Sequence, residues 1–129
     1  MIGTLLARGS VIPADRLEIT ATGAEDGIVL HLGGRLNIDS SPLLRDRLLA
    51  MLLEESLGAV IIDLANVSYI DSSGVATLIE ALKFARKRQV ALRLTGLQGR
   101  LLHLFETTGV LGLFEVNGAG SSSPGSKVY

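Results

Sequence analysis

The order of apolar and polar residues along the chain predicts short strands followed by amphipathic helices. Residues 17–22 alternate apolar and polar side chains, which is typical of a half-exposed strand. A second strand is expected at 28–32, paired antiparallel to the first through a polar loop and ended by Gly33-Gly34. The unbroken apolar run 59–64 predicts a strand that is buried on both faces of a parallel sheet.

Three segments carry apolar residues at helical spacing. The first helix is expected to begin at residues 39–42 (Asp-Ser-Ser-Pro), because proline is tolerated in a first helical turn. The second follows the polar residues 71–73 and ends in the basic residues at 83–88, and the third covers 98–107. The first helix is also apolar on its flanks, at Leu43, Leu49 and Leu53. That surplus fits the core best, with a partner surface as the alternative.

These elements predict one α/β domain in which a mixed sheet of about four to five strands packs against helices. The remaining strands are expected at 90–95 and, on an edge, at 113–116. A chain of 129 residues suffices for one domain with a core. We assign 17–116 to this domain and leave 1–16 as an extension or an extra edge strand. Residues 117–129 have the composition of a flexible tail.

The step from the apolar strand to the second helix is the most informative part of the sequence. A loop at 65–69 leads into Ile-Asp-Ser-Ser-Gly at 70–74. Asp71, Ser72 or Ser73 is a natural N-cap, and the same helix start can stabilise an anion. Such a motif alone is only a helix cap. The right-handed crossover rule, however, places it at the carboxyl edge of the sheet, where α/β sheets usually carry their sites.

Composition excludes several classes of function. The formal net charge of -1, from 12 basic and 13 acidic residues, gives no electrostatic signal for nucleic acid or an anionic membrane. No apolar run approaches the roughly 20 residues of a membrane span, and residues 1–13 lack the pattern of a signal peptide, so a cytoplasmic protein is expected. The absence of cysteine, the lack of a histidine cluster and the lack of a phosphate-binding glycine loop predict no metal and no cofactor.

A serine beside an aspartate invites an enzymatic interpretation. A nucleophilic serine needs a base within hydrogen-bond reach and usually a strained turn. His31 lies in a predicted strand and His103 on the third helix, where packed or surface histidines are ordinary. Phosphorylation of an aspartate needs an acidic pocket, for which only Asp63 and Asp71 are candidates. We therefore expect no catalytic activity.

The apolar strand with its internal Asp63, the residues 70–74 and the apolar helix after them resemble the signature of the STAS domain family, in particular the bacterial anti-sigma factor antagonists. The resemblance extends to 33–48, which looks like the second strand and first helix of the family. It also extends to 92–116, which looks like its fourth strand, third helix and last strand.

The resemblance implies a switch operated by phosphate. The unmodified antagonist binds an anti-sigma factor that is also a serine kinase and so frees a sigma factor, which regulates transcription. The kinase then phosphorylates the serine after the aspartate of the motif, and the complex dissociates. By position this serine is Ser72, with Ser73 as the alternative. A serine phosphatase is the second implied partner.

The resemblance also suggests a set of partner-binding residues: Asn37, Asp63, Asp71, Ser72, Ser73 and Gly74. Asp71 is interpreted first as a cap and then as a partner contact. For Asp63, a carboxylate satisfied by loop N–H groups and a recognition role remain equally open. Members of the family commonly carry a Gly-Glu-Leu-Asp-like turn after the second strand, where this chain has Gly34-Arg35-Leu36-Asn37. Asn37 keeps the hydrogen-bonding shape without the charge, and Arg35 reverses a charge.

STAS domains also serve as accessory subunits of membrane transport complexes of the lipid ABC type. The intact motif at 70–74 favours the sigma pathway. Arg35, Asn37 and the apolar first helix leave room for the transport alternative. Whether the domain forms a homodimer stays open.

Overall fold

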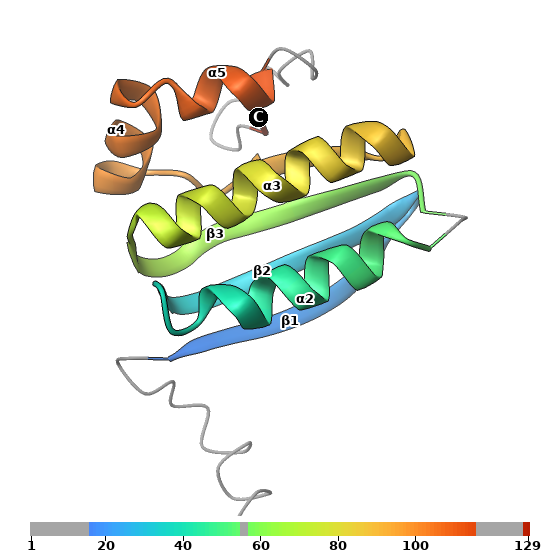
Figure 1. The fold of residues 1–129 in the computed structure, drawn as a ribbon, viewed down its shortest axis with the longest axis horizontal. Helices are drawn as coiled ribbons and strands as arrows, with labels where there is room; N and C mark the ends of the chain where they lie inside the picture. Colours follow the sequence, from blue (N-terminus) through green and yellow to red (C-terminus); the bar gives the residue numbers. More distant parts are fainter. Residues whose placement is uncertain (1–15, 55–56, 116–127) are drawn as a thin grey trace, which may run out of the picture.

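The computed structural model describes residues 16–54, 57–115 and 128–129 of the 129-residue chain. Four strands and four helices lie within these ranges (Figure 1). They are β1 (Leu17–Ala24), β2 (Gly27–Leu36), α2 (Ser41–Leu52), β3 (Ala59–Ile70), α3 (Ser72–Arg88), β4 (Ala91–Thr95), α4 (Gly99–Thr107) and α5 (Val110–Glu115). The predicted α/β fold with a mixed sheet packed against helices is confirmed.

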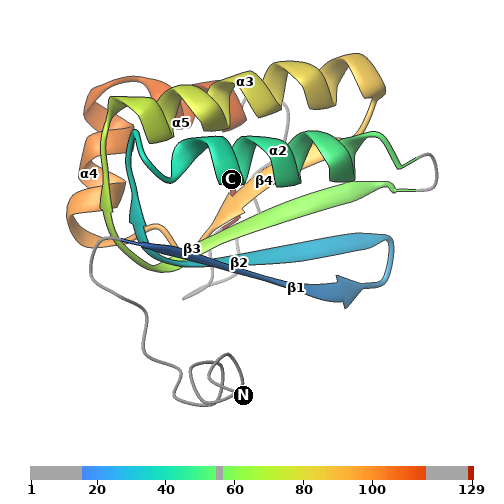
Figure 2. The same cartoon turned by 60° about the horizontal axis from the view of Figure 1, so that its bottom comes forward.

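The sheet has the strand order β1-β2-β3-β4. β1 and β2 form the predicted antiparallel hairpin, while β2, β3 and β4 run parallel and are joined through α2 and α3. Both crossovers advance in the same direction along the sheet, and crossovers of one hand then place their helices on the same face. Figure 2 shows α2 and α3 together on one side of the sheet.

This one-sided arrangement corrects the expectation that residues 59–64 are buried on both faces. Burial alternates along the strand: Val60 and Ile62 are fully buried toward the helices. Ile61 and Asp63 point to the other face and remain partly exposed. An unbroken apolar run therefore does not require full burial on both faces, because Ile61 stays partly exposed here.

The core lies between the sheet and the helices. Leu44, Leu48 and Leu52 form the inner stripe of α2 and are completely buried. Each such leucine stabilises the fold by about 1.5–3 kcal/mol relative to an exposed one. Leu43 and Leu53 are 49% and 54% exposed, so the assignment of these two flanking leucines to the core was wrong. They lie off the inner stripe and face solvent.

The C-terminal part of the domain differs from the sequence prediction. An edge strand was expected at 113–116, but Val110–Glu115 form helix α5, which packs against α3 and β4. Gly109 separates α4 from α5 with a positive φ of 81°. Val110, Leu111 and Phe114 are buried, and their spacing fits a single helical face. The short apolar run gave no means of telling a strand from a helix of this length.

The two C-terminal residues lie beside β4. Val128 pairs antiparallel with Thr95, and the backbone N–H of Tyr129 donates to the carbonyl of Leu94 at 2.6 Å. Tyr129 is 7% exposed. The prediction of a flexible tail did not anticipate this contact. Residues 117–127 of that tail, and residues 1–15 of the N-terminal extension or edge strand predicted at 1–16, lie outside the described residues.

Candidate functional site

Two irregularities interrupt the pairing of β3 with β2 before the motif at 70–74. They fall in the segment 65–69 that the sequence analysis interpreted as a loop. The pairing of β2 with β3 shifts twice, between His31 and Gly33 and again between Gly34 and Arg35. At each shift β3 carries one residue more than β2, which is the pattern of a β-bulge. Strand β2 therefore does not end at Gly33-Gly34 as expected but continues to Leu36.

The bulges keep apolar residues of β3 on the core side. Leu64, Val67 and Ile70 are all buried, although they are spaced by three and not by two. An ideal strand would turn Val67 toward solvent, and each extra residue restores the inward direction. The predicted loop at 65–69 is thus the bulged end of a long strand, and Asp71 follows directly after this strand.

Asp71 is the N-cap of α3. Its side-chain Oδ1 accepts hydrogen bonds from the backbone N–H groups of Ser73 at 2.9 Å and Gly74 at 3.2 Å. Two of the unpaired donors at the helix start are therefore satisfied by a carboxylate within the chain. Of the three capping candidates named from the sequence, the structure selects the aspartate. The carboxylate also complements the positive end of the helix dipole.

Ser72 and Ser73 follow the cap but differ in accessibility. Ser72 is exposed, whereas Ser73 is partly buried. Within the described ranges the hydroxyl of Ser72 makes no hydrogen bond. A phosphate on this hydroxyl would lie next to the Asp71 carboxylate, which already occupies the N–H groups of Ser73 and Gly74. The helix start therefore offers that phosphate less compensation than an uncapped terminus would.

Gly74 joins the helix start to the end of β2. The backbone N–H of Asp71 donates to the carbonyl of Leu36 at 3.1 Å. A Cβ on Gly74 would lie 2.7 Å from side-chain carbons of both Leu36 and Ile70. Gly74 is buried, so its contribution is close packing and not a surface contact. This packing places the ends of β2 and β3 side by side.

The turn after β2, residues Asn37–Ser40, is held by its own polar groups. The Asn37 side-chain Oδ1 accepts from the backbone N–H groups of Asp39 at 3.0 Å and Ser40 at 3.1 Å. The Ser40 hydroxyl accepts from the backbone N–H of Asn37 at 2.9 Å and donates to the carbonyl of Arg35 at 2.8 Å. Asn37 thus shapes the turn that leads into α2. Ile38 lies within this turn, and its residue is 68% exposed.

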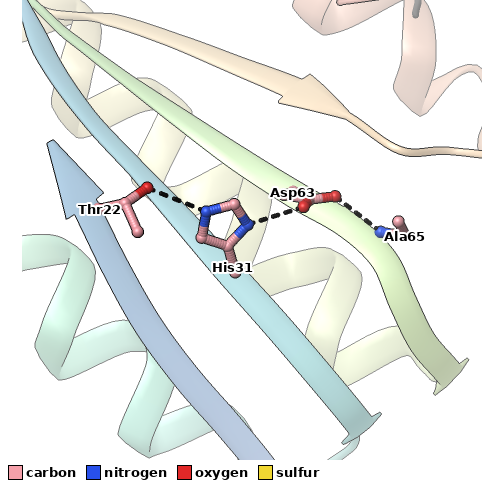
Figure 3. A network of polar contacts seen from close by, with 4 residues as sticks. All are labelled: Thr22, His31, Asp63 and Ala65. Carbon is pink, nitrogen blue, oxygen red and sulfur yellow. Dashed lines mark hydrogen bonds and ion pairs between the residues drawn. The ribbon is translucent and has the colours of Figure 1, made fainter. Parts of the chain in front are cut away.

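Asp63 lies apart from this group, on the face of the sheet opposite α2 and α3 (Figure 3). Its Oδ2 lies 2.8 Å from Nδ1 of His31, and its Oδ1 accepts from the backbone N–H of Ala65 at 3.0 Å. The other ring nitrogen of His31 lies 3.0 Å from the hydroxyl of Thr22. Ala65 belongs to the first bulge, so Asp63 stabilises the strand that leads to the motif.

Sequence reasoning singled out Arg35 as a charge reversal but missed its contact with Tyr69. The two residues are paired across β2 and β3, and the Arg35 guanidinium carbon lies 3.9 Å from the centre of the Tyr69 ring. Such a cation–π contact contributes about 0.5–1 kcal/mol at an exposed site. Arg35 and Tyr69 are opposite each other only because the second bulge shifts the pairing of β2 with β3 by one residue. The sequence alone does not show where such a bulge lies.

Replacing Asp71 tests the cap separately from the serine. We expect Asp71→Ala to lower the free energy of unfolding by about 1 kcal/mol, because two N–H groups lose their acceptor. Asp71→Asn should retain most of this stability, since its carbonyl oxygen can still accept. Urea denaturation followed by circular dichroism measures both. Ser72→Ala is the matched control and should change stability little, whereas an equal loss in this control would argue against the cap.

Comparison of the sequence with known proteins agrees with this geometry. The STAS domain model matches residues 18–119. The chain belongs to the STAS domain family. The anti-sigma-B factor antagonist of Listeria monocytogenes is 35% identical over 91 residues, which cover 70% of this chain and 79% of the relative. The family resemblance stated from the motif is therefore confirmed.

Solved structures show that the STAS fold is shared across different settings. The Bacillus cell fate determinant SpoIIAA in its phosphorylated form matches with a TM-score of 0.61 at 17% identity, over 75% of this chain and 87% of that one. The murine solute carrier 26 family member A9 anion transporter matches with a TM-score of 0.64 at 14% identity, over 86% of this chain and 20% of that one. At these identities the STAS likeness concerns the fold alone.

Two negative findings concern the described residues only. In the described part of the chain, no helix combines the length and apolar character needed to cross a membrane. Across residues 16–54, 57–115 and 128–129, no three His, Cys, Asp or Glu side chains are grouped in a way that could hold a metal ion.

Proposed function

We propose that this STAS domain is an anti-sigma factor antagonist that is switched by phosphorylation of Ser72. In its unmodified form it binds an anti-sigma factor that is also a serine kinase, and this binding releases a sigma factor for transcription. Phosphorylation of Ser72 ends the complex, and a serine phosphatase restores the binding form. The protein acts by binding and not by catalysis, and it works in the cytoplasm.

The exposed hydroxyl of Ser72 directly after the Asp71 cap is the observation that carries this proposal. A kinase needs an accessible hydroxyl, and Ser72 is exposed while Ser73 is partly buried. The Listeria monocytogenes relative, which is 35% identical to this chain over 91 residues, is named an anti-sigma-B factor antagonist. The phosphorylated SpoIIAA structure indicates that this fold is compatible with a phosphate group.

Phosphorylation adds about -1.5 to -2 charges and three acceptor oxygens. Because the Asp71 carboxylate already accepts from the first free N–H groups of α3, little of that charge is neutralised within the domain. A partner docked over Ser72 would have to desolvate the phosphate beside a second negative charge. The switch therefore needs no refolding of the domain.

The transport alternative has weaker support. Its strongest observation is the match to the anion transporter, which concerns 20% of that protein at 14% identity. In this alternative the domain would dock on a permease or its ATPase, and Ser72 would need no phosphate.

The decisive experiment incubates the purified chain with ATP and each anti-sigma factor kinase encoded by the source bacterium. We expect one kinase to add a single phosphate, and peptide mass spectrometry should place it on Ser72. Ser72→Ala should abolish the label while Ser73→Ala retains it. Labelling at Ser73 alone would refute the site, and the absence of both labelling and binding with every kinase would refute the function.

A further inference from the structure

Three polar side chains are linked by hydrogen bonds across the face of the sheet opposite α2 and α3. The Oγ1 atom of Thr22 on β1 lies 3.0 Å from Nε2 of His31 on β2. The Nδ1 atom of His31 in turn lies 2.8 Å from Oδ2 of Asp63 on β3. Figure 3 shows the three side chains in a row across these strands. We call Thr22, His31 and Asp63 the polar relay.

The pairing of three strands produces the polar relay. His31 is directly opposite Asp63 in the parallel pair of β2 and β3. Thr22 is opposite Val29 in the antiparallel pair of β1 and β2, and His31 follows Val29 by two residues. Such diagonal neighbours lie on one face and are within reach of a long side chain. The relay therefore depends on strand register and not on a local motif, so the spacing of these residues in the sequence does not reveal it.

The hydrogen bonds assign one state to the histidine. An ionised carboxylate only accepts, so Nδ1 of His31 carries the proton that is donated to Asp63. In the neutral ring Nε2 is then the acceptor, and the Thr22 hydroxyl donates to it. Asp63 is also held from its other side. Its Oδ1 accepts from the N–H of Ala65 at 3.0 Å, and a Cβ on Gly96 would lie only 2.6 Å from this oxygen.

The polar relay has the arrangement of an activated hydroxyl. A hydroxyl bonded to the free nitrogen of a histidine, with a carboxylate orienting the ring, is the pattern of a nucleophile with its base. The histidine takes the proton as the oxygen attacks, and the carboxylate stabilises the ring cation that forms. Thr22 is exposed, so a small molecule can reach its oxygen. His31, expected to be an ordinary packed or surface histidine, thus occupies the position of a general base.

We propose that Thr22 is a site of covalent acylation by small, uncharged activated esters and thioesters. The Thr22 oxygen bonds to the carbonyl carbon of the donor, and its proton passes to Nε2 of His31. The bond between that carbon and the leaving group then breaks, and the leaving group departs with the electron pair and receives the proton from His31. The products are an O-acyl threonine and the protonated leaving group. The chain is itself consumed in this reaction, which is a modification and not catalytic turnover.

The surroundings of Thr22 define the class of donor. Its neighbours on this face, Thr20 on β1 and Val29 on β2, carry no charge. The relay itself contains the negative carboxylate of Asp63, whereas a phosphoryl donor needs cations around its charges. The relay supplies a nucleophile and a base but no group that stabilises an oxygen anion, so the donor must bring a good leaving group. The site is separate from the proposed phosphorylation switch, since Ser72 lies at the start of α3 on the other face.

The test exposes the purified chain to 4-nitrophenyl acetate and follows acetylation residue by residue by mass spectrometry. Thr20 is the reference within the same molecule, because it is exposed on the same strand and face but lies outside the relay. We expect Thr22 to gain an acetyl group at least about a hundredfold faster than Thr20, since a general base contributes about 10²–10⁴-fold. In urea-unfolded wild type the two threonines should react at the same rate.

Three variants separate the roles within the relay. Thr22→Ser should still be acetylated, because its hydroxyl can occupy the same position. His31→Gln should slow acetylation at Thr22 at least about a hundredfold, since the base is lost. Asp63→Asn should slow it at least about tenfold, because its amide N–H would donate to Nδ1 and leave the proton on Nε2. The Asn oxygen can still accept from Ala65, so urea denaturation should show little change in stability for this variant.

The outcomes that would overturn the proposal are distinct from these. Equal rates at Thr22 and Thr20 in the folded wild type would show that the relay does not activate the hydroxyl, whatever the variants do. Acetyl groups found only on His31 or on lysine side chains would exclude transfer to the threonine. Unchanged rates at Thr22 in folded His31→Gln and Asp63→Asn would show that the hydrogen bonds only hold the strands together. Each of these results leaves the proposed function of the domain intact.

Discussion

Ser72→Asp is expected to bind the anti-sigma factor at least about a hundredfold more weakly than the unmodified chain. This loss corresponds to about 2.7 kcal/mol. Desolvating an unpaired carboxylate at a contact costs that much or more. The new charge would lie beside Asp71, whose carboxylate already accepts from the free N–H groups of Ser73 and Gly74. Ser72→Ala should bind like wild type and stay bound when ATP is added, because the kinase can no longer modify it.

Isothermal titration calorimetry without ATP, followed by size-exclusion chromatography with ATP, measures both properties. Lys83→Gln is the control for net charge, because it also makes the domain one unit more negative at an exposed position of α3. It should bind normally. If Ser72→Asp and Ser72→Ala bind equally well, the phosphate does not act through its charge at the interface.

Gly74→Ala is expected to lower the free energy of unfolding by about 1 to 2 kcal/mol. The new methyl group would lie 2.7 Å from carbons of Leu36 and Ile70 and 2.9 Å from the carbonyl oxygen of Leu36. Overpacking of this kind typically costs 1–3 kcal/mol. Alanine favours a helix over glycine by about 1 kcal/mol, and this gain is too small to offset the clash. Gly74→Val should be still more harmful.

Gly112→Ala provides a matched control within α5. Nothing lies within 4 Å of a Cβ placed there, so this variant should be neutral or slightly stabilising. Urea denaturation of both variants under the same conditions measures the difference. Equal stabilities of the two variants would show that the contact between α3 and the end of β2 can relax at little cost.

Most elements could be predicted from the sequence, because their periodicity is imposed by the core. The hairpin, the inner stripe of α2 and the helix after the motif all follow from this rule. The end of β3 could not be predicted, since its bulges replace a spacing of two by a spacing of three at Leu64, Val67 and Ile70. Glycine pairs usually interrupt strands, yet Gly33 and Gly34 lie opposite these bulges within β2.

The candidate site was predictable in its chemistry and less so in its geometry. The motif located Asp71 and the two serines, because capping residues at a helix start follow from local rules. It did not separate Asp63 from this group, because the run 59–64 was interpreted as buried on both faces, whereas burial in the structure alternates and places Asp63 on the face opposite α2 and α3. The exposed positions of Ile38 and Leu43 likewise depend on which faces of the fold stay uncovered.

In the turn Asn37–Ser40, the residues that hold the backbone are different from the residue that is most exposed. Its hydrogen bonds come from Asn37 and Ser40, while the side chain at its tip makes none of them. Residue 38 can therefore change during evolution without loss of folding. Related domains could therefore carry different side chains at this position while keeping the same backbone turn.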